Sequence, residues 1–218
     1  MVKISPFQGL RYDKDKVSLK KVVCPPYDVI NQMQRKAYIK ESVNNIVRIA
    51  LPQRKNLTHD YAKAKSDLSL WIKKGILKYD SEPSLYVYIQ ECDVNGKRIS
   101  RCGFFSLLKL DDKGDSGVLP HENVFSKPLL DRANLMKHAK VHLSPIFIVF
   151  KDAKAKAQNI LSNITKSAKP ESDIYADGSR HKLWPVTDKK IIEKLVKHVN
   201  SSDIYRGWTS SLQGIYAG

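Results

Sequence analysis

Residues 84–110 read SLYVYIQECDVNGKRISRCGFFSLLKL and carry the clearest structural signal in the chain. Apolar and β-branched side chains alternate with polar ones on both sides of Asn95-Gly96. This alternation is typical of strands, and Asn-Gly favours the two-residue turn that joins antiparallel neighbours. The sequence therefore predicts a β-hairpin that pairs Ser84–Cys92 with Lys97–Leu110.

Outside the hairpin, helical and extended patterns alternate without a regular strand–helix–strand order. Helical spacing predicts helices over Asn31–Glu41, Thr58–Gly75 (with Thr58 as N-cap and Gly75 as the stop), Leu129–Ala139, Lys151–Lys166 and Thr187–Val199. Apolar runs predict strands over Asn45–Leu51, Lys182–Val186 and Ile146–Phe150, the last covered on both faces. These patterns predict an α+β fold with a mixed or antiparallel sheet flanked by helices.

Composition is ordinary for a globular protein, with 42% hydrophobic residues in a chain of 218. No apolar run approaches the roughly 20 residues that a membrane span needs, and Met1–Leu10 lacks the apolar stretch of a signal peptide. No membrane association and a cytoplasmic location are therefore expected. The three cysteines form no CxxC pair, which argues against a disulfide framework and a zinc ribbon.

The formal net charge of +16 invites a nucleic-acid interpretation, because clustered basic residues release counterions from phosphate backbones. The lysines, however, are scattered through every segment, and no recognition motif accompanies them. Such dispersion favours a solvated surface or a small phosphorylated or amino-acid ligand over a groove that reads nucleic acid.

Two prolines, Pro25 and Pro26, stiffen a loop that presents Tyr27 and Asp28. A carboxylate on a stiff loop can hold a fixed direction, as a general base or a phosphate or metal ligand requires. The structural alternative is that the prolines shape a turn and that Asp28 caps the following helix.

A second group of ionisable residues comprises His121-Glu122 and Asp131-Arg132. An imidazole, two carboxylates and a guanidinium within one short stretch are suited to acid–base or phosphate chemistry. The structural alternative is an ion-pair network in which Glu122 pairs with Arg132.

His138 and His142 stand four residues apart, but the chain leaves a helix between them and no third ligand is evident, so no metal site is predicted. No phosphate-binding glycine string of the GxxxxGK[ST] or GxGxxG type occurs.

His121-Glu122 and Asp131-Arg132 occur together with residues 6–11 (PFQGLR), residues 25–30 (PPYDVI) and Ser144-Pro145-Ile146. This set of motifs resembles the family known as domain of unknown function 1015. The resemblance covers roughly residues 3–205 and implies that residues 1–205 are the N-terminal portion of a larger, two-part fold. In that family a second half opens with Tyr-Ile-Ala-Asp-Gly-His-His-Arg-Tyr.

Here Arg206–Gln213 stands where that motif is expected. One codon choice for these eight residues, shifted by one base, encodes Ala-Asp-Gly-His-His-Arg-Tyr. We therefore expect residues 206–218 to be an out-of-frame tail and the chain to be a truncated form.

The motif that is lost resembles the Gly-His-His-Arg signature of the ParB and sulfiredoxin-like fold. The resemblance implies a nucleotide- or phosphate-handling enzyme, in particular a kinase-like phosphotransferase acting on a small amino acid such as serine, with Mg²⁺ and a nucleotide as its expected cofactors. Within that scheme the catalytic residues are Asp28, His121, Glu122 and Asp131, the phosphate-binding residues are Arg11 and Arg132, and Tyr27 and Ser144 are further site residues.

In this scheme the truncated chain is expected to be inactive. The alternative function is a non-catalytic basic module that binds nucleic acid or nucleotide as ParB-like regulators do. A chain that lacks its second half is also expected to expose apolar surface and to self-associate.

Overall fold

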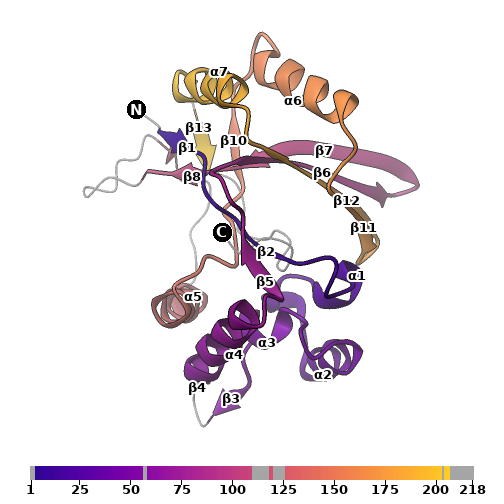
Figure 1. The fold of residues 1–218 in the computed structure, drawn as a ribbon, viewed down its shortest axis with the longest axis vertical. Helices are drawn as coiled ribbons and strands as arrows, with labels where there is room; N and C mark the ends of the chain where they lie inside the picture. The colour runs from indigo at the N-terminus through magenta and orange to yellow at the C-terminus, as the bar shows by residue number, and fades with distance from the viewer. Residues whose placement is uncertain (1–2, 56–57, 110–117, 120–125, 203, 207–218) are drawn as a thin grey trace. The chain divides into compact units, whose positions relative to one another are not determined.

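The computed structural model describes residues 3–55, 58–109, 118–119, 126–202 and 204–206. The predicted α+β class is confirmed, since helices and mainly antiparallel strands share the chain (Figure 1).

The described residues form two compact units. Unit 1 contains residues 3–8, 81–109, 118–119, 146–202 and 204–206, and unit 2 contains residues 9–55, 58–80 and 126–145. In the described part of the chain, every helix is too short or too polar to span a bilayer.

Unit 1 is built on a four-stranded antiparallel sheet with strand order β11-β12-β6-β7. The strands are β6 (Leu85–Val94), β7 (Lys97–Phe105), β11 (Ser172–Ala176) and β12 (Ser179–Val186). The predicted hairpin is confirmed as β6 and β7. Its turn residues have positive φ, 51° at Asn95 and 74° at Gly96, as a type I′ turn requires.

Two helices of unit 1, α6 (Lys156–Ser167) and α7 (Lys189–Asn200), pack on one face of this sheet (Figure 1). Apolar side chains of both helices and of β6 and β12 form one buried cluster, which includes Leu85, Val87, Ala157, Leu161, Trp184, Val186, Ile192, Leu195 and Val199. The carboxylate of Asp188 caps α7 by accepting hydrogen bonds from the amides of Lys190 and Ile191, at 2.8 and 3.1 Å.

Short strands complete unit 1. β1 (Ile4–Ser5) pairs with β8 (Leu107–Leu108), and β10 (Ile148–Phe150) and β9 (Val118–Leu119) flank β13 (Ile204–Arg206). β13 runs parallel to β9 and antiparallel to β10, so this sheet is mixed.

The expected burial of Ile146–Phe150 on both faces is wrong. Ile148 and Phe150 pack against the core of unit 1, but Val149 between them is 50% exposed. Side chains alternate between the two faces of a strand, and only one face of β10 is covered.

The sequence also did not predict strand β11. β11 and β12 form a second hairpin. Its turn residues, Asp177 and Gly178, have φ of 49° and 73°, so the Asp-Gly pair plays the part that Asn95-Gly96 plays in the first hairpin.

Unit 2 is mainly helical. It contains α1 (Leu19–Val22), the 3₁₀ helix η1 (Tyr27–Val29), α2 (Gln32–Glu41), α3 (Val47–Ala50), α4 (Tyr61–Lys73) and α5 (Ser126–Ala139). Two strand pairs accompany the helices: β2 (Leu10–Tyr12) with β5 (Leu77–Tyr79), and β3 (Arg54–Lys55) with β4 (Thr58–His59). The apolar core of this unit includes Leu10, Val22, Ile46, Val47, Ile49, Leu68, Trp71, Leu77 and Leu135.

The strand predicted over Asn45–Leu51 is wrong, because residues 47–50 form helix α3. The buried apolar positions here also fit one face of a helix, and a short run cannot distinguish the two periods. Buried Asn45 stabilises the helical form. Its side-chain amide donates to the carbonyls of Lys21 and Val23, and its Oδ1 accepts from the amide of Val47.

The helix predicted after Thr58 is confirmed as α4, but its N-cap is Asp60, whose Oδ1 accepts from the amide of Lys63 at 2.9 Å. The chain turns away after α4 at Gly75, where φ is 63°. The predicted stop is therefore confirmed, and the cap lies two residues later than expected.

Candidate functional site: an arginine pocket and a neighbouring clasp

The proline loop and helix α5 meet in unit 2. The guanidinium of Arg132 lies over the ring of Tyr27, with its central carbon 3.7 Å from the ring centroid, a cation–π geometry. These residues are more than 100 positions apart in the sequence, and the structure brings them together.

Arg132 joins three segments of unit 2. Its Nε donates to Asp131 Oδ2 at 3.0 Å, its Nη2 also contacts that oxygen, and its Nη1 donates to the carbonyl of Ala50 at 2.8 Å. The side chains of Arg132 and Asp131 are only 17% and 20% exposed, so solvent screens this pair weakly. We call Tyr27, Ala50, Asp131 and Arg132 the clasp, because they tie the proline loop and the end of α3 to α5.

Two residues that the sequence did not single out also hold Asp131. The hydroxyl of Tyr61 donates to Asp131 Oδ1 at 2.5 Å, and Nδ1 of His59 lies 2.9 Å from the same oxygen. This buried nitrogen makes no well-directed hydrogen bond to a described residue, so its approach to Asp131 is a close contact and not a hydrogen bond. The ring of His138 stacks on Tyr61, with centroids 5.4 Å apart.

These contacts shift the pKa values of Asp131 and Tyr61. Burial raises the pKa of Asp131, but hydrogen bonds from Tyr61 and Arg132 and the charges of Arg132 and His59 outweigh it, so this pKa lies below its ordinary value. Burial and the neighbouring Asp131 raise the pKa of Tyr61 to about 12. Asp131 is thus a carboxylate whose two oxygens are both engaged, which suits it to positioning other groups.

Asp28 has a different environment. Its side chain is exposed, with no hydrogen bond or ion pair to any residue that the structure describes. The structural alternative, that Asp28 caps the next helix, is wrong, since Asn31 caps α2 in a reciprocal capping box with Gln34. Asp28 therefore remains available for chemistry on the loop that carries Tyr27.

The other proposed site residues lie elsewhere in the chain. Arg11 is on β2, and its guanidinium binds Asp80, with Nε 2.8 Å and Nη2 2.6 Å from the carboxylate oxygens. Ser144 is half-buried in the segment after α5. His121 and Glu122 lie outside the described residues, and so does the proposed pairing of Glu122 with Arg132.

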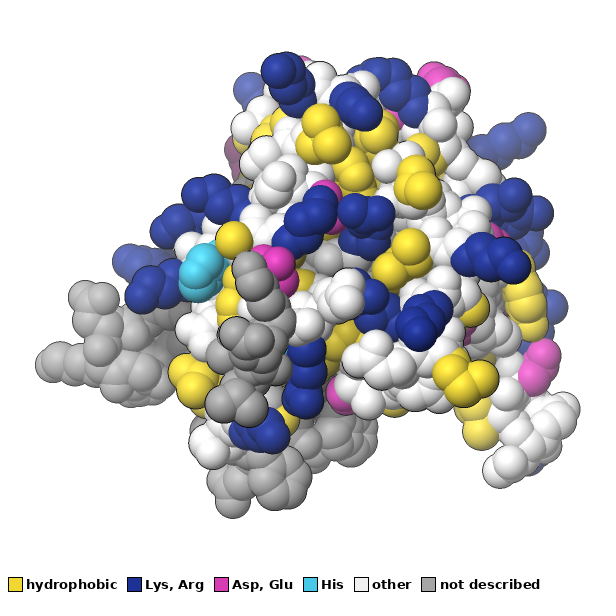
Figure 2. Space-filling view, turned by 90° about the horizontal axis from the view of Figure 1, so that it is seen from below, with side chains coloured by type: hydrophobic (Ala, Val, Ile, Leu, Met, Phe, Trp, Pro, Cys, Tyr) yellow, Lys and Arg dark blue, Asp and Glu magenta, His cyan; other side chains and the backbone are white. Residues whose placement is uncertain are grey.

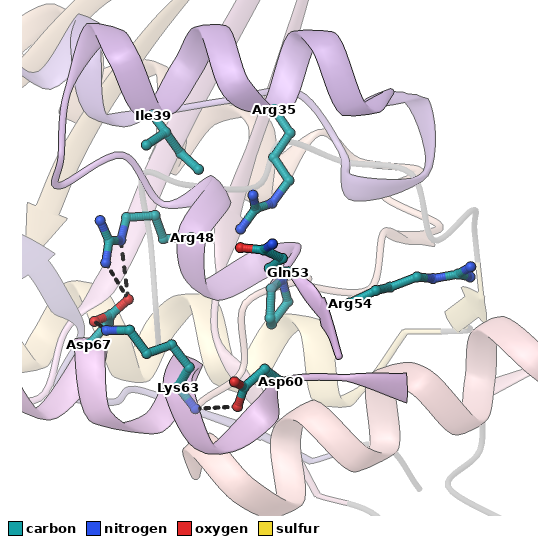
Figure 3. A pocket seen from close by; sticks show the side chains of 9 residues that line it. Arg35, Ile39, Arg48, Gln53, Arg54, Asp60, Lys63 and Asp67 are labelled. Carbon is teal, nitrogen blue, oxygen red and sulfur yellow. Dashed lines mark hydrogen bonds and ion pairs between the residues drawn. The ribbon is translucent and has the colours of Figure 1, made fainter. Parts of the chain in front are cut away.

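A pocket of about 500 Å³ lies beside the clasp in unit 2 (Figure 3). The segment between α3 and α4 connects the two, because the carbonyl of Ala50 accepts from Arg132 and the carbonyl of Leu51 accepts from Arg35, at 2.7 Å. The pocket is lined by Arg35, Ile39, Arg48, Pro52, Gln53, Arg54, Asp60, Lys63 and Asp67, and we call it the arginine pocket.

The carboxylates of the arginine pocket are already engaged. Asp67, only 4% exposed, accepts from Arg48 Nε and Nη2 at 3.1 and 2.8 Å and also contacts Lys63 Nζ. Burial raises the pKa of Asp67, but these partners outweigh it and hold the pKa below its ordinary value. Asp60 uses one oxygen to cap α4.

Arg35 has no carboxylate partner in the part of the chain that the structure describes. Burial, and then the positive charge of Arg48, lower its pKa. Arg35 and Arg48 both line the pocket; in Figure 3 Arg35 points from α2 toward Gln53 and Arg48 turns toward Asp67, whereas Arg54 extends away from both. Two guanidinium groups thus share a pocket whose described carboxylates do not neutralise both, which is suited to binding an anion.

This local concentration differs from the rest of the surface. On the face shown in Figure 2, the Lys and Arg side chains are spread over the whole face and not gathered in one patch. The high net charge is therefore mainly dispersed there, as the sequence indicates.

The described residues hold no ready-made metal cluster. They contain no cluster of three His, Cys, Asp or Glu side chains that could hold a metal ion. Asp131 is engaged by its neighbours, and Asp28 offers one exposed carboxylate.

The fold and these sites define a class: an α+β protein whose helical unit carries an arginine-lined pocket. More specifically, the chain belongs to the family described as Protein of unknown function (DUF1015), whose model matches residues 4–206. This confirms the resemblance inferred from the motifs. Neither the curated proteins nor the solved structures contain a match to the chain.

Proposed function

We propose that this chain is the phosphate-binding part of a phosphotransferase that acts on a small amino acid such as serine, and that the arginine pocket holds a phosphate group. One observation carries the proposal: Arg35 and Arg48 face the same pocket, and the described residues offer no carboxylate to Arg35. A bound dianion would relieve the repulsion between the two guanidinium groups.

The hydrogen bonding of the two arginines supports a phosphate in particular. Asp67 occupies Nε and Nη2 of Arg48, and the Leu51 carbonyl occupies Nε of Arg35. The remaining guanidinium donors form planar forks, which match phosphate oxygens bidentately. Because Asp67 and Leu51 already hold the two groups, little side-chain entropy is lost when an anion binds.

The residues that line the arginine pocket also indicate which part of a ligand it can hold. Ile39 and Pro52 are the apolar residues of its described lining, which contains no aromatic side chain on which a nucleobase could stack. The pocket therefore suits a phosphate ester or the phosphate end of a nucleotide.

The clasp supports this pocket through the backbone at the end of α3. Arg132 holds Ala50, one residue before the Leu51 carbonyl that positions Arg35. In the proposed enzyme Asp131 and Arg132 position the pocket, and Asp28 is the exposed carboxylate that accepts a proton from the substrate hydroxyl. His121 and Glu122 remain proposed acid–base residues.

Isothermal titration calorimetry with pyrophosphate, ADP and O-phosphoserine tests the binding step. Each charge-assisted hydrogen bond contributes about 1.5–3 kcal/mol, so Arg35→Gln or Arg48→Gln should weaken binding at least about tenfold. Arg101→Gln, on exposed β7 of unit 1, removes the same charge and should have no effect. Failure of the wild-type chain to bind any of these compounds at millimolar concentration would refute the pocket, as would equal binding by Arg35→Gln.

The catalytic step is assigned to the form that carries the Gly-His-His-Arg motif, and residues 206–218 are proposed to be its out-of-frame remnant. Sequencing the encoding DNA across this segment tests the frame. With the frame restored, ³¹P NMR should detect phosphoserine formed from serine and ATP or ADP, and Asp28→Asn should abolish it. A restored protein that transfers phosphate from neither donor would rule out the phosphotransferase.

A further inference from the structure

A second cavity of about 500 Å³ lies in unit 1, between helices α6 and α7. It is lined by Lys156, Asn159 and Ile160 of α6, by Lys194, Lys197 and His198 of α7, and by Ser201 just after α7. We call it the lysine groove. It shares no residue with the arginine pocket, and the proposed function does not use it.

The described lining of the groove carries net positive charge. Its described lining contains three lysines and no Asp or Glu, and none of the three forms an ion pair with a described residue. The neighbouring carboxylate, Asp152, is engaged by residues at the edge of the groove. Its Oδ1 accepts from the amide of Lys156 and contacts His198 Nε2, at 2.9 and 2.8 Å, and its Oδ2 accepts from the amide of Gln158 at 3.0 Å.

The kind of cation indicates the kind of ligand. Lysine is a flexible, strongly hydrated point charge, whereas a guanidinium presents a rigid fork for a single phosphate. Lys190, Lys194 and Lys197 recur at helical spacing along the exposed side of α7, a row of about 10 Å at a rise of about 1.5 Å per residue. Successive phosphates of one DNA strand stand about 3.4 Å apart along the axis, so this row can face several of them.

The packing of α7 argues against a lipid surface. An interfacial helix needs an exposed apolar face to insert among the lipid chains. The apolar residues of α7, Ile192, Leu195 and Val199, are buried in the core of unit 1. Only its charged side remains for a partner.

We propose that the lysine groove binds the phosphodiester backbone of nucleic acid without reading its sequence. Binding depends on charge density along α6 and α7, so it is steeply dependent on salt. The partner is a strand of DNA or RNA, and the contacts are made to phosphates by Lys156, Lys194 and Lys197.

Fluorescence anisotropy of the full chain with a labelled 20-nucleotide single strand and with a 20-base-pair duplex tests this. The triple variant Lys156→Glu, Lys194→Glu, Lys197→Glu should bind both probes at least tenfold more weakly. Removing three phosphate contacts should also reduce the slope of log K against log salt by about 2 for the single strand and about 2.7 for the duplex. The triple Lys→Gln variant, which introduces no like-charge pairs, should show the same direction of change.

The matched control is Lys36→Glu, Lys65→Glu, Lys73→Glu, which changes the net charge equally at exposed positions of unit 2. It should change affinity less than threefold. Equal losses in the two triple variants would show that overall charge, not the groove, binds the probe and would overturn the proposal.

Two further outcomes would also overturn it: no binding by the wild-type chain at low salt, or equal competition by a poly-glutamate peptide, which would point to an acidic protein partner. Circular dichroism verifies folding of each variant. The lysine-groove variant should bind pyrophosphate with unchanged affinity. Failure of the nucleic-acid proposal can therefore be distinguished from failure of the proposal that the arginine pocket binds phosphate.

Discussion

The lysines of helices α6 and α7 in unit 1 and the arginines of unit 2 are placed in opposite ways. In unit 1 an apolar core lies between a sheet and two helices, and the lysines of α6 and α7 stay in solvent. In unit 2 arginines are drawn partly inside and are held by Asp67, Asp131 and backbone carbonyls. Arginine side chains held by hydrogen bonds are oriented before a ligand arrives, whereas solvent-exposed lysine side chains are not. Unit 2 is therefore suited to a specific small anion, and unit 1 to a diffuse polyanion.

Among the tests of this contrast, the largest change in stability is expected from a substitution in the clasp of unit 2. Asp131→Asn removes the charge that faces Arg132 and leaves a largely buried guanidinium unpaired. Breaking a buried pair in this way should lower the free energy of unfolding by about 2–4 kcal/mol. Native-state hydrogen exchange of α4 and α5 amides, read by mass spectrometry, measures the change. Unchanged exchange would mean that the clasp does not stabilise unit 2.

A smaller effect, in unit 1, concerns His181, which is buried against Tyr88. Its Nδ1 lies 2.7 Å from the Tyr88 hydroxyl, and burial lowers its pKa more than the Ala176 carbonyl and the charge of Asp177 raise it. As the pH falls below about 6.5, the unfolded chain binds a proton that the folded chain refuses, so unit 1 loses stability toward mild acid.

Urea unfolding between pH 7.5 and 5 should show this loss, and His181→Gln should flatten the curve. The pKa of Asp131 in unit 2 is lowered, so its contribution is present above about pH 3.8 and is lost only as the pH falls through its folded value. If unit 1 amides keep full protection at pH 5 in the wild-type chain, the assignment to His181 fails.

The smallest effect is expected at the surface of unit 1. Arg180 and Asp173 face each other across β11 and β12 with Nη2 2.7 Å from Oδ2, but their side chains are 44% and 33% exposed. A double-mutant cycle with Arg180→Ala and Asp173→Ala should give a coupling far smaller than the loss caused by Asp131→Asn, because solvent screens the pair. A coupling as large as the clasp effect would remove the distinction between held and solvated charges.

Local features of the fold were predictable because neighbouring residues specify them. Asn95-Gly96 predicted the β6–β7 turn, and the apolar spacing that ends at Gly75 predicted α4. The errors fall where a short pattern fits two periods, as at Asn45–Leu51, or where burial depends on a distant neighbour, as at Val149. Of the proposed site residues, the structure brings Tyr27, Asp131 and Arg132 together and places Arg11 beside Asp80.

The amino-acid sequence by itself determined the hairpin, the main helices, the family and the adjacency of Asp131 and Arg132, since each depends on residues close along the chain. Only the tertiary structure decided that Tyr61 and His59 hold Asp131, about 70 positions away, and that Arg35 and Arg48 share one pocket. Charged side chains acquire partners through packing of the apolar faces beneath them. The sequence shows those faces, but folding sets which charges meet.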